Sequence, residues 1–183
     1  MSRRIAVIVG SLREGSLNRQ FARALVKLAP STYEFQFIGI GQLPLYNQDE
    51  DLAPSPSVTS FREEVKACQA VLFVTPEYNR SIPGVLKNAI DQGSRPSKQS
   101  VWARMPAGIV GVSPGAIRTA AAQQHLRTIL AHLDMPTLGQ PEAFIHGTED
   151  NFDEAGNLSE GVVKFMKRWM DAFLEFVEAN QPK

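Results

Sequence analysis

Residues 5–18 read IAVIVGSLREGSLN and combine the pattern of a buried strand with that of a polar loop. IAVIV, residues 5–9, is a continuous apolar run rich in β-branched residues, which is typical of a parallel strand covered on both faces. GSLREGSLN, residues 10–18, then supplies two glycines, an arginine and several hydroxyl and amide side chains. A buried strand that ends in such a segment predicts a loop that holds an anion.

The strand pattern recurs along the chain and alternates with helical patterns. Apolar runs at 70–75 and 107–112 predict two further buried strands, and weaker strands are expected around 35–37 and 138–145. Amphipathic segments predict helices at 16–29, 57–68, 81–94, 118–134 and 159–180. This alternation predicts an α/β fold with a doubly wound, five-stranded parallel sheet and helices on both faces. The Pro-rich stretch 41–57 is expected to be a long surface loop.

Length and composition indicate one domain spanning residues 1–183. The chain has 183 residues, of which 43% are hydrophobic, enough for a sizeable core. Its 19 lysines and arginines balance 19 aspartates and glutamates, so the overall charge indicates no nucleic-acid and no membrane partner. The charge is uneven, however, because residues 1–29 hold six basic side chains against Glu14 alone.

Cys68 is the only cysteine in the sequence. An intramolecular disulfide and a cysteine-based metal cluster are therefore excluded, and a cytoplasmic location is expected. The apolar run near the N-terminus is too short for a secretion signal. The spacing of Cys68 from Val58, Phe61 and Val65 predicts that Cys68 faces the core as a small apolar residue and not as a reactive thiol.

The loop at 10–18 fits neither common nucleotide-binding fingerprint. Gly10 and Gly15 have the Walker A separation, but Ser16 and Leu17 stand where that motif needs lysine and serine or threonine. The G-x-G-x-x-G pattern is absent, and FIGIGQ, residues 37–42, has no acid at the end of the second strand. Neither a Walker A phosphate loop nor a G-x-G-x-x-G dinucleotide site is therefore predicted.

Ser11, Arg13, Ser16 and Asn18 remain, on a loop that runs into a helix N-terminus. Free amides and the helix dipole favour a phosphate dianion there, and Arg13 adds charge-assisted hydrogen bonds. The alternative is a capped helix with a polar lead-in, which would need only Ser16 or Asn18.

Two more loops are candidates, because ligands of doubly wound sheets bind beyond the carboxyl ends of the strands. PEYNRSIPG, residues 76–84, places Tyr78 directly after a buried strand, among groups able to hydrogen-bond a planar heterocycle. Taken alone, Tyr78 fits a core tyrosine with its hydroxyl in water equally well. SPGAIR, residues 113–118, follows the strand predicted at 107–112.

GSLREGSLN together with TPEYNRSIPGVLKNAID, residues 75–91, resembles the NADPH-dependent FMN reductases of flavodoxin-like fold. This group includes bacterial chromate and quinone reductases and azoreductase-like proteins. The resemblance implies that the FMN phosphate is bound by Ser11, Arg13, Ser16, Leu17 and Asn18. It implies that the isoalloxazine is lined by Pro76, Glu77, Tyr78 and Asn79, with Ser113, Pro114 and Gly115 at its other edge.

The activity implied by the resemblance is hydride transfer from NADPH, or NADH, through FMN to a quinone or another small oxidant, such as a flavin, an azo compound or chromate. Such an enzyme follows ping-pong kinetics and requires no catalytic acid or base side chain. Arg80 is expected to attract the phosphates of the nicotinamide nucleotide; the alternative is a solvated loop arginine. His125 and His132 lie seven residues apart without a third ligand, so no metal site is expected.

A homodimer is expected from apolar groups on the loop at 43–54 and on the helix that follows Pro83. The groups expected to be partly exposed are Leu43, Leu45, Tyr46, Val85 and Ile90. The resemblance implies a dimer built near the flavin, or a homotetramer made of two such dimers.

Two functions of other classes remain open at this point. One is a flavodoxin-like electron carrier, or a flavin-binding regulatory module, without NAD(P)H turnover. The neutral charge argues in part against a carrier, because carriers that dock basic partners are strongly acidic. The other is a nucleotide-binding α/β protein that uses no flavin.

Overall fold

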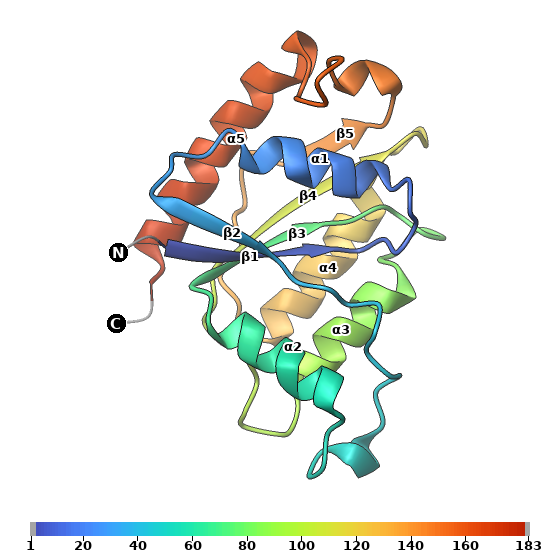
Figure 1. The fold of residues 1–183 in the computed structure, drawn as a ribbon, viewed down its shortest axis with the longest axis vertical. Coiled ribbons are helices and arrows are strands. Elements are labelled where there is room, and N and C mark those ends of the chain that lie inside the picture. Colours follow the sequence, from blue (N-terminus) through green and yellow to red (C-terminus); the bar gives the residue numbers. More distant parts are fainter. Residues whose placement is uncertain (1–2, 182–183) are drawn as a thin grey trace.

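The computed structural model describes residues 3–181, with every side chain in that range except that of Glu149 (Figure 1). Five parallel strands form one sheet in the order β2-β1-β3-β4-β5. The strands are β1 (Arg3–Val9), β2 (Tyr33–Phe37), β3 (Ala70–Val74), β4 (Ala107–Ser113) and β5 (Ala143–His146). The helices are α1 (Leu17–Val26), α2 (Pro56–Lys66), α3 (Gly84–Ser94), α4 (Ala120–His132) and α5 (Glu160–Ala179), with short 3-10 helices at Gln48–Glu50 and Glu149–Asn151. The predicted fold is confirmed, since this is the strand order of flavodoxin-like sheets.

The central strands are apolar throughout because helices cover both faces of the sheet. Every residue of β3 is buried, as are the last five residues of β1. α1 and α5 pack on one face, and α2, α3 and α4 pack on the other (Figure 1). Trp169 and Phe173 of α5 stack in the first of these layers, and Trp102 fills the second.

The strand expected at 138–145 is shorter in the structure. The Leu138 amide donates to the Ala107 carbonyl over 2.9 Å, beside the start of β4, but regular pairing resumes only at Ala143. Pro141 lies between them and has no N–H to donate, so it interrupts the ladder. The predicted boundary was therefore wrong by several residues at its start.

The structure corrects the prediction for Ile90. This side chain is only 1% exposed, because α3 turns it into the core beneath the sheet. Leu43, Tyr46 and Val85 are partly exposed as expected, and Leu45 is 84% exposed. The apolar surface available to a partner is therefore centred on the loop before α2 and not on the buried side of α3.

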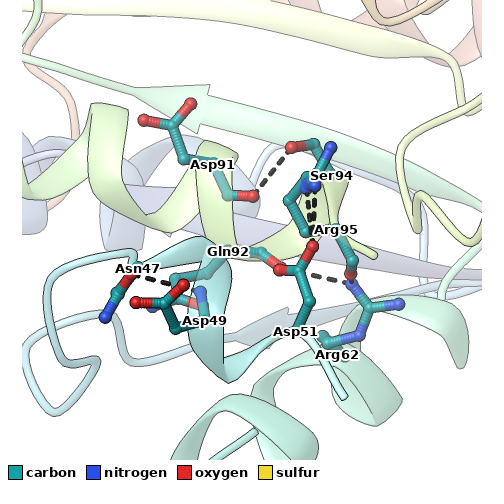
Figure 2. Close-up of polar contacts among 8 residues, drawn as sticks. All are labelled: Asn47, Asp49, Asp51, Arg62, Asp91, Gln92, Ser94 and Arg95. Carbon is teal, nitrogen blue, oxygen red and sulfur yellow. Dashed lines mark hydrogen bonds and ion pairs between the residues drawn. The ribbon is translucent and has the colours of Figure 1, made fainter. Parts of the chain in front are cut away.

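Arg62 of α2 ties the C-terminus of α3 to the chain that follows it (Figure 2). Its guanidinium is buried and donates to the carbonyls of Gln92, Gly93 and Arg95, and to that of Gln99 over 2.7 Å. Arg95 in turn binds the Asp51 carboxylate over 2.7 Å. A single side chain thus supplies the donors that the last carbonyls of α3 lack. We call Arg62, Arg95 and Asp51 the arginine clamp.

Cys68 lies in the core, as predicted, with 5% of its surface exposed. Its thiol is within hydrogen-bonding distance of the Glu64 carbonyl, at 3.4 Å. Burial raises the pKa of this thiol to about 11. The neutral thiol is therefore the form that the folded state prefers.

This raised pKa predicts that ionisation of the Cys68 thiol lowers the stability of the folded protein in alkaline solution. The contribution is fully present below the thiol's ordinary pKa of 9.0 and disappears as the pH rises toward 11, because the unfolded chain releases the proton more readily. Urea unfolding at pH 8 and pH 10 should therefore show a larger loss for the unmodified protein than for Cys68→Ala. Equal losses in the two proteins would contradict the prediction.

The start of the chain meets the end of α5. Arg3 forms an ion pair with Glu178, and the Tyr33 hydroxyl donates to the same carboxylate over 2.8 Å. These contacts join β1, β2 and α5 at the amino edge of the sheet, opposite the edge at which the strands end.

Within residues 3–181, no helix has the length and apolar character needed to cross a membrane.

Candidate functional site

Three loops meet at the carboxyl edge of the sheet because β1, β3 and β4 are neighbours in it. The segments are 10–16 after β1, 75–83 after β3 and 114–119 after β4. These are the three loops that the sequence singled out, and Figure 1 shows them at the same end of the molecule.

The first loop presents hydrogen-bond donors at the start of α1. Ser16 is the N-cap, and its Oγ accepts from the Arg19 amide over 3.3 Å. Ser11 is buried, whereas Arg13 is exposed and donates to the Gly15 carbonyl over 2.9 Å. The amides of the first helical turn, beginning with Leu17, have no partner within the helix, as at any helix start. The loop therefore combines amide, hydroxyl and guanidinium donors, the set that suits a phosphate.

Asn18, in the first turn of α1, joins this helix to the end of β4. Its Nδ2 donates to the Val112 carbonyl over 2.8 Å, and its Oδ1 accepts from the Val112 amide over 3.0 Å. The side chain is buried, and this double contact fixes α1 against the end of β4. One Nδ2 hydrogen is left for another acceptor. The bridge was not foreseen, because it joins positions 94 residues apart.

The second loop is a tight hairpin. Tyr78 and Ser81 exchange backbone hydrogen bonds of 2.9 and 3.0 Å, and the two residues between them have positive φ, 50° for Asn79 and 65° for Arg80. Tyr78 is 49% exposed, so the alternative of a core tyrosine is wrong. The turn thus leaves this ring exposed at the carboxyl edge of the sheet.

Glu77 anchors the hairpin to α4. One carboxylate oxygen accepts from the Ala122 amide over 3.0 Å, in the first turn of α4, and the other pairs with Arg80 over 3.2 Å. The Glu77 side chain is 6% exposed, whereas that of Arg80 is 71% exposed. The carboxylate is thus compensated by a helix N-terminus and a cation.

His125 of α4 makes a second anchor that sequence reasoning missed. Its Nδ1 lies 3.0 Å from the Ser81 Oγ, at the other end of the hairpin. His125 therefore packs against the second loop, while His132 lies near the far end of α4. Among the residues described here, no group of three histidine, cysteine or carboxylate side chains is arranged to hold a metal ion.

The third loop begins at Ser113, whose Oγ accepts from the Gly115 amide over 3.2 Å. Pro114 and Gly115 are exposed beside it. Beneath the loops, Thr75 is fully buried between two glycines. A Cβ on Gly10 would lie 2.5 Å from the Thr75 Oγ1, and one on Gly111 would lie 2.5 Å from the Thr75 carbonyl oxygen. Both glycines are therefore needed for the strand ends to approach one another.

Residues 3–150 match the profile of the family described as NADPH-dependent FMN reductase. The chain belongs to this family. The match covers all three loops of the site and ends before α5. The family match therefore includes residues 10–18 and 75–91, the two segments on which the resemblance was based.

Similar proteins extend the comparison beyond residue 150. The chain is 49% identical over 178 residues to a quinone reductase of Pseudomonas putida, covering 97% of this chain and 96% of that protein. It is 48% identical to a 2-hydroxy-1,4-benzoquinone reductase of a Burkholderia species, covering 97% of each. It is 45% identical over 152 residues to an NAD(P)H-dependent FMN reductase of Pseudomonas aeruginosa, covering 82% of each.

Solved structures agree with these matches. The flavoenzyme NAD(P)H:(acceptor) oxidoreductase FerB from Paracoccus denitrificans superposes with a TM-score of 0.94 at 39% identity, covering 98% of this chain and all of that one. A flavodoxin from Pseudomonas aeruginosa, at 16% identity and a TM-score of 0.57, shares the fold, covering 93% of this chain and 99% of that one. The protein is therefore an oxidoreductase of the NADPH-dependent FMN reductase family, and the reductase prediction is confirmed over the electron carrier.

Proposed function

We propose that this reductase oxidises NADPH or NADH and reduces quinones, with FMN held by the three loops at the carboxyl edge of the sheet. The observation that carries the proposal is the arrangement of the loops: donors at the start of α1, an exposed Tyr78 on a braced hairpin, and an open turn at Pro114 and Gly115. Relatives named quinone reductase at 48% and 49% identity support the acceptor class.

The first loop would hold the FMN phosphate. Arg13, Ser11 and Ser16 supply side-chain donors, and Leu17 and Asn18 supply amides at the helix start. Because the site includes a charged donor and the positive end of a helix, a doubly charged phosphate is favoured over a neutral group. Asn18 adds its remaining N–H while it holds the third loop in place.

The second and third loops would line the two edges of the isoalloxazine. Pro76 to Asn79 provide one edge, and Ser113, Pro114 and Gly115 provide the other. Glu77 keeps its carboxylate on the α4 amide and on Arg80, so the negative charge is compensated and the loop is kept rigid. Tyr78 offers a flat apolar surface to a ring or to a substrate.

When bound by these loops, FMN would supply the hydride-transfer chemistry between the nicotinamide nucleotide and the acceptor. The residues of the chain bind the phosphate, orient the ring and leave one face open to both substrates in turn. No side chain is assigned as a catalytic acid or base. Flavins, azo compounds and chromate are further acceptors under this proposal.

The proposal is tested with purified protein and FMN. We expect a flavin absorption spectrum after removal of free FMN, and oxidation of NADPH or NADH only when a benzoquinone is added. Double-reciprocal plots at several quinone concentrations should give parallel lines. Tight FMN binding without NAD(P)H oxidation by any quinone would contradict the enzyme and favour a regulatory flavin-binding module.

Arg80 is the subject of a first functional prediction. Its guanidinium is largely exposed beside the hairpin, so it can reach an anionic nucleotide while its partner Glu77 stays anchored to α4. Arg80→Ala should raise the KM for NADPH by about 3- to 10-fold and change kcat less, the pattern of lost uniform binding. Arg168→Ala, at an exposed arginine of α5, is the control. A KM equal to that of the unmodified protein would remove Arg80 from the site.

Assembly gives a second prediction. The loop at 43–46 carries Leu45, which is 84% exposed, and is tied to α3 because Asn88 and Gln92 donate to the Pro44 carbonyl over 2.9 and 3.0 Å. A rigid apolar surface of this kind favours association. Light scattering at micromolar concentration should give a mass at least twice the 20.2 kDa of one chain, as a homodimer or homotetramer. Leu45→Asp should lower this mass. A mass equal to that of one chain for the unmodified protein would contradict the proposal.

A cytoplasmic location and a single domain over residues 1–183 belong to the same proposal. The lone buried Cys68 supports the first. The packing of α5 against the core shared by β1, β3 and β4 supports the second, although α5 lies beyond the family match.

A further inference from the structure

A groove outside the three-loop site runs between α1 and the chain that follows β2. Its volume is about 490 Å³, within the range of small-molecule sites. β1, α1, the end of β2 and residues 38–42 form its walls. The groove lies on the side of β1 that faces β2, away from β3 and β4. Leu12 is the one residue of the first loop that lines it.

Two arginines of α1 give the groove its charge. Arg19 and Arg23 are four residues apart, so they lie on one face of the helix, and both line the groove. The lining contains no acidic side chain. Among the side chains that the structure describes, which exclude that of Glu149, neither arginine is paired with a carboxylate within 4.0 Å. Two uncompensated cations at the edge of a concave site favour an anionic ligand.

Apolar side chains also line the groove. Leu12 is 52% exposed and Phe37 is 41% exposed, and the largely buried Val9 of β1 forms part of the wall. Exposed large apolar side chains that line a common groove lose unfavourable contact with water when a flat apolar body covers them. The ligand that fits both parts has a ring and an anionic group.

We propose that this groove binds an amphipathic organic anion: a flat, apolar ring system carrying one carboxylate or sulfonate. Arg19 and Arg23 bind the anionic group, and the ring lies against Leu12, Phe37 and Val9. The site is separate from the redox site, because the loops after β3 and β4 take no part in it. This inference does not depend on the quinone acceptor proposed above.

The test uses FMN-loaded protein and two probes of the same ring, naphthalene-2-carboxylate and uncharged naphthalene-2-methanol. By titration calorimetry at low salt, the carboxylate should bind one per chain and about tenfold or more tighter than the alcohol. Arg19→Gln/Arg23→Gln should weaken carboxylate binding by at least about tenfold. Arg168→Gln is the matched control, since that arginine is an exposed helical arginine outside the groove.

The single variant Arg23→Gln controls for an indirect effect of the Arg19 substitution on the first loop. Arg19 donates to the Ser11 carbonyl at 3.4 Å, and the single variant leaves that contact in place. It should weaken carboxylate binding while FMN affinity and the unfolding midpoint stay unchanged. Equal affinity for the two probes, binding unaffected by the double substitution, or displacement of the carboxylate by NADP⁺ would each overturn the proposal.

Discussion

Replacement of Arg62 by methionine is expected to lower the free energy of unfolding by about 3–5 kcal/mol. Arg62 is 6% exposed, and its guanidinium donates to four backbone carbonyls at the end of α3 and in the chain after it. Methionine fills part of the space but removes the donor from the buried Gln92 carbonyl and the part-buried Arg95 carbonyl, while Gly93 keeps its bond from the Val101 amide. Of the arginine clamp, only the ion pair between Arg95 and Asp51 would then remain.

Urea unfolding followed by circular dichroism measures this effect. Lys66→Met is the control, because Lys66 lies on the same helix, α2, and is exposed. That change should alter stability by no more than about 0.5 kcal/mol. Arg62→Lys should recover little, because one ammonium group cannot reach carbonyls on both sides as a guanidinium fork does. A loss below about 1 kcal/mol for Arg62→Met would show that water replaces the clamp.

Arg13→Ala is expected to weaken FMN binding by about 1.5–3 kcal/mol, which is roughly a 10- to 150-fold rise in Kd. Arg13 is exposed at the start of α1, and a phosphate there would receive its charge-assisted hydrogen bonds. Quinone reduction should fall at low FMN and recover when FMN is in excess, because the substitution leaves the hairpin and the third loop intact.

Fluorescence titration of the apoprotein gives the Kd. Riboflavin, which lacks the phosphate, tests whether Arg13 acts through the phosphate of FMN. Its affinity should be the same for the unmodified protein and for Arg13→Ala. Arg104→Ala is the control for an exposed arginine outside the loop. An unchanged FMN Kd in Arg13→Ala would remove the assignment of the phosphate to this loop.

The strands and helices followed from the sequence because their signals are local. Continuous apolar runs identified β1, β3 and β4, and these are the strands that both helical layers cover. The start of β5 was predicted too early because Leu138 is apolar, whereas regular pairing with β4 begins after Pro141, at Ala143. Ile90 was expected to be exposed because its helix was treated by itself, without the sheet that it packs against.

The three loops of the site were also predictable, since parallel strands place their carboxyl ends at one edge. The contacts that brace the loops were not. Glu77 reaches a helix 45 residues away, and Asn18 reaches β4 across 94 residues. No local pattern marks such pairs. The sequence contains Gly10 and Gly111 but does not show why glycine is needed at these positions. That need depends on how closely Thr75 packs between the strands.

The meeting of Arg3 with Glu178 has a practical consequence for handling the protein. The start of β1 and the end of α5 lie together at the edge of the sheet opposite the three loops. A surface or a fusion partner attached beside Arg3 or Glu178 would therefore lie at the edge of the sheet opposite the candidate site. Immobilised in this way, the molecule would present its loops outward, and electrode or sensor measurements would reach them without obstruction by the tether.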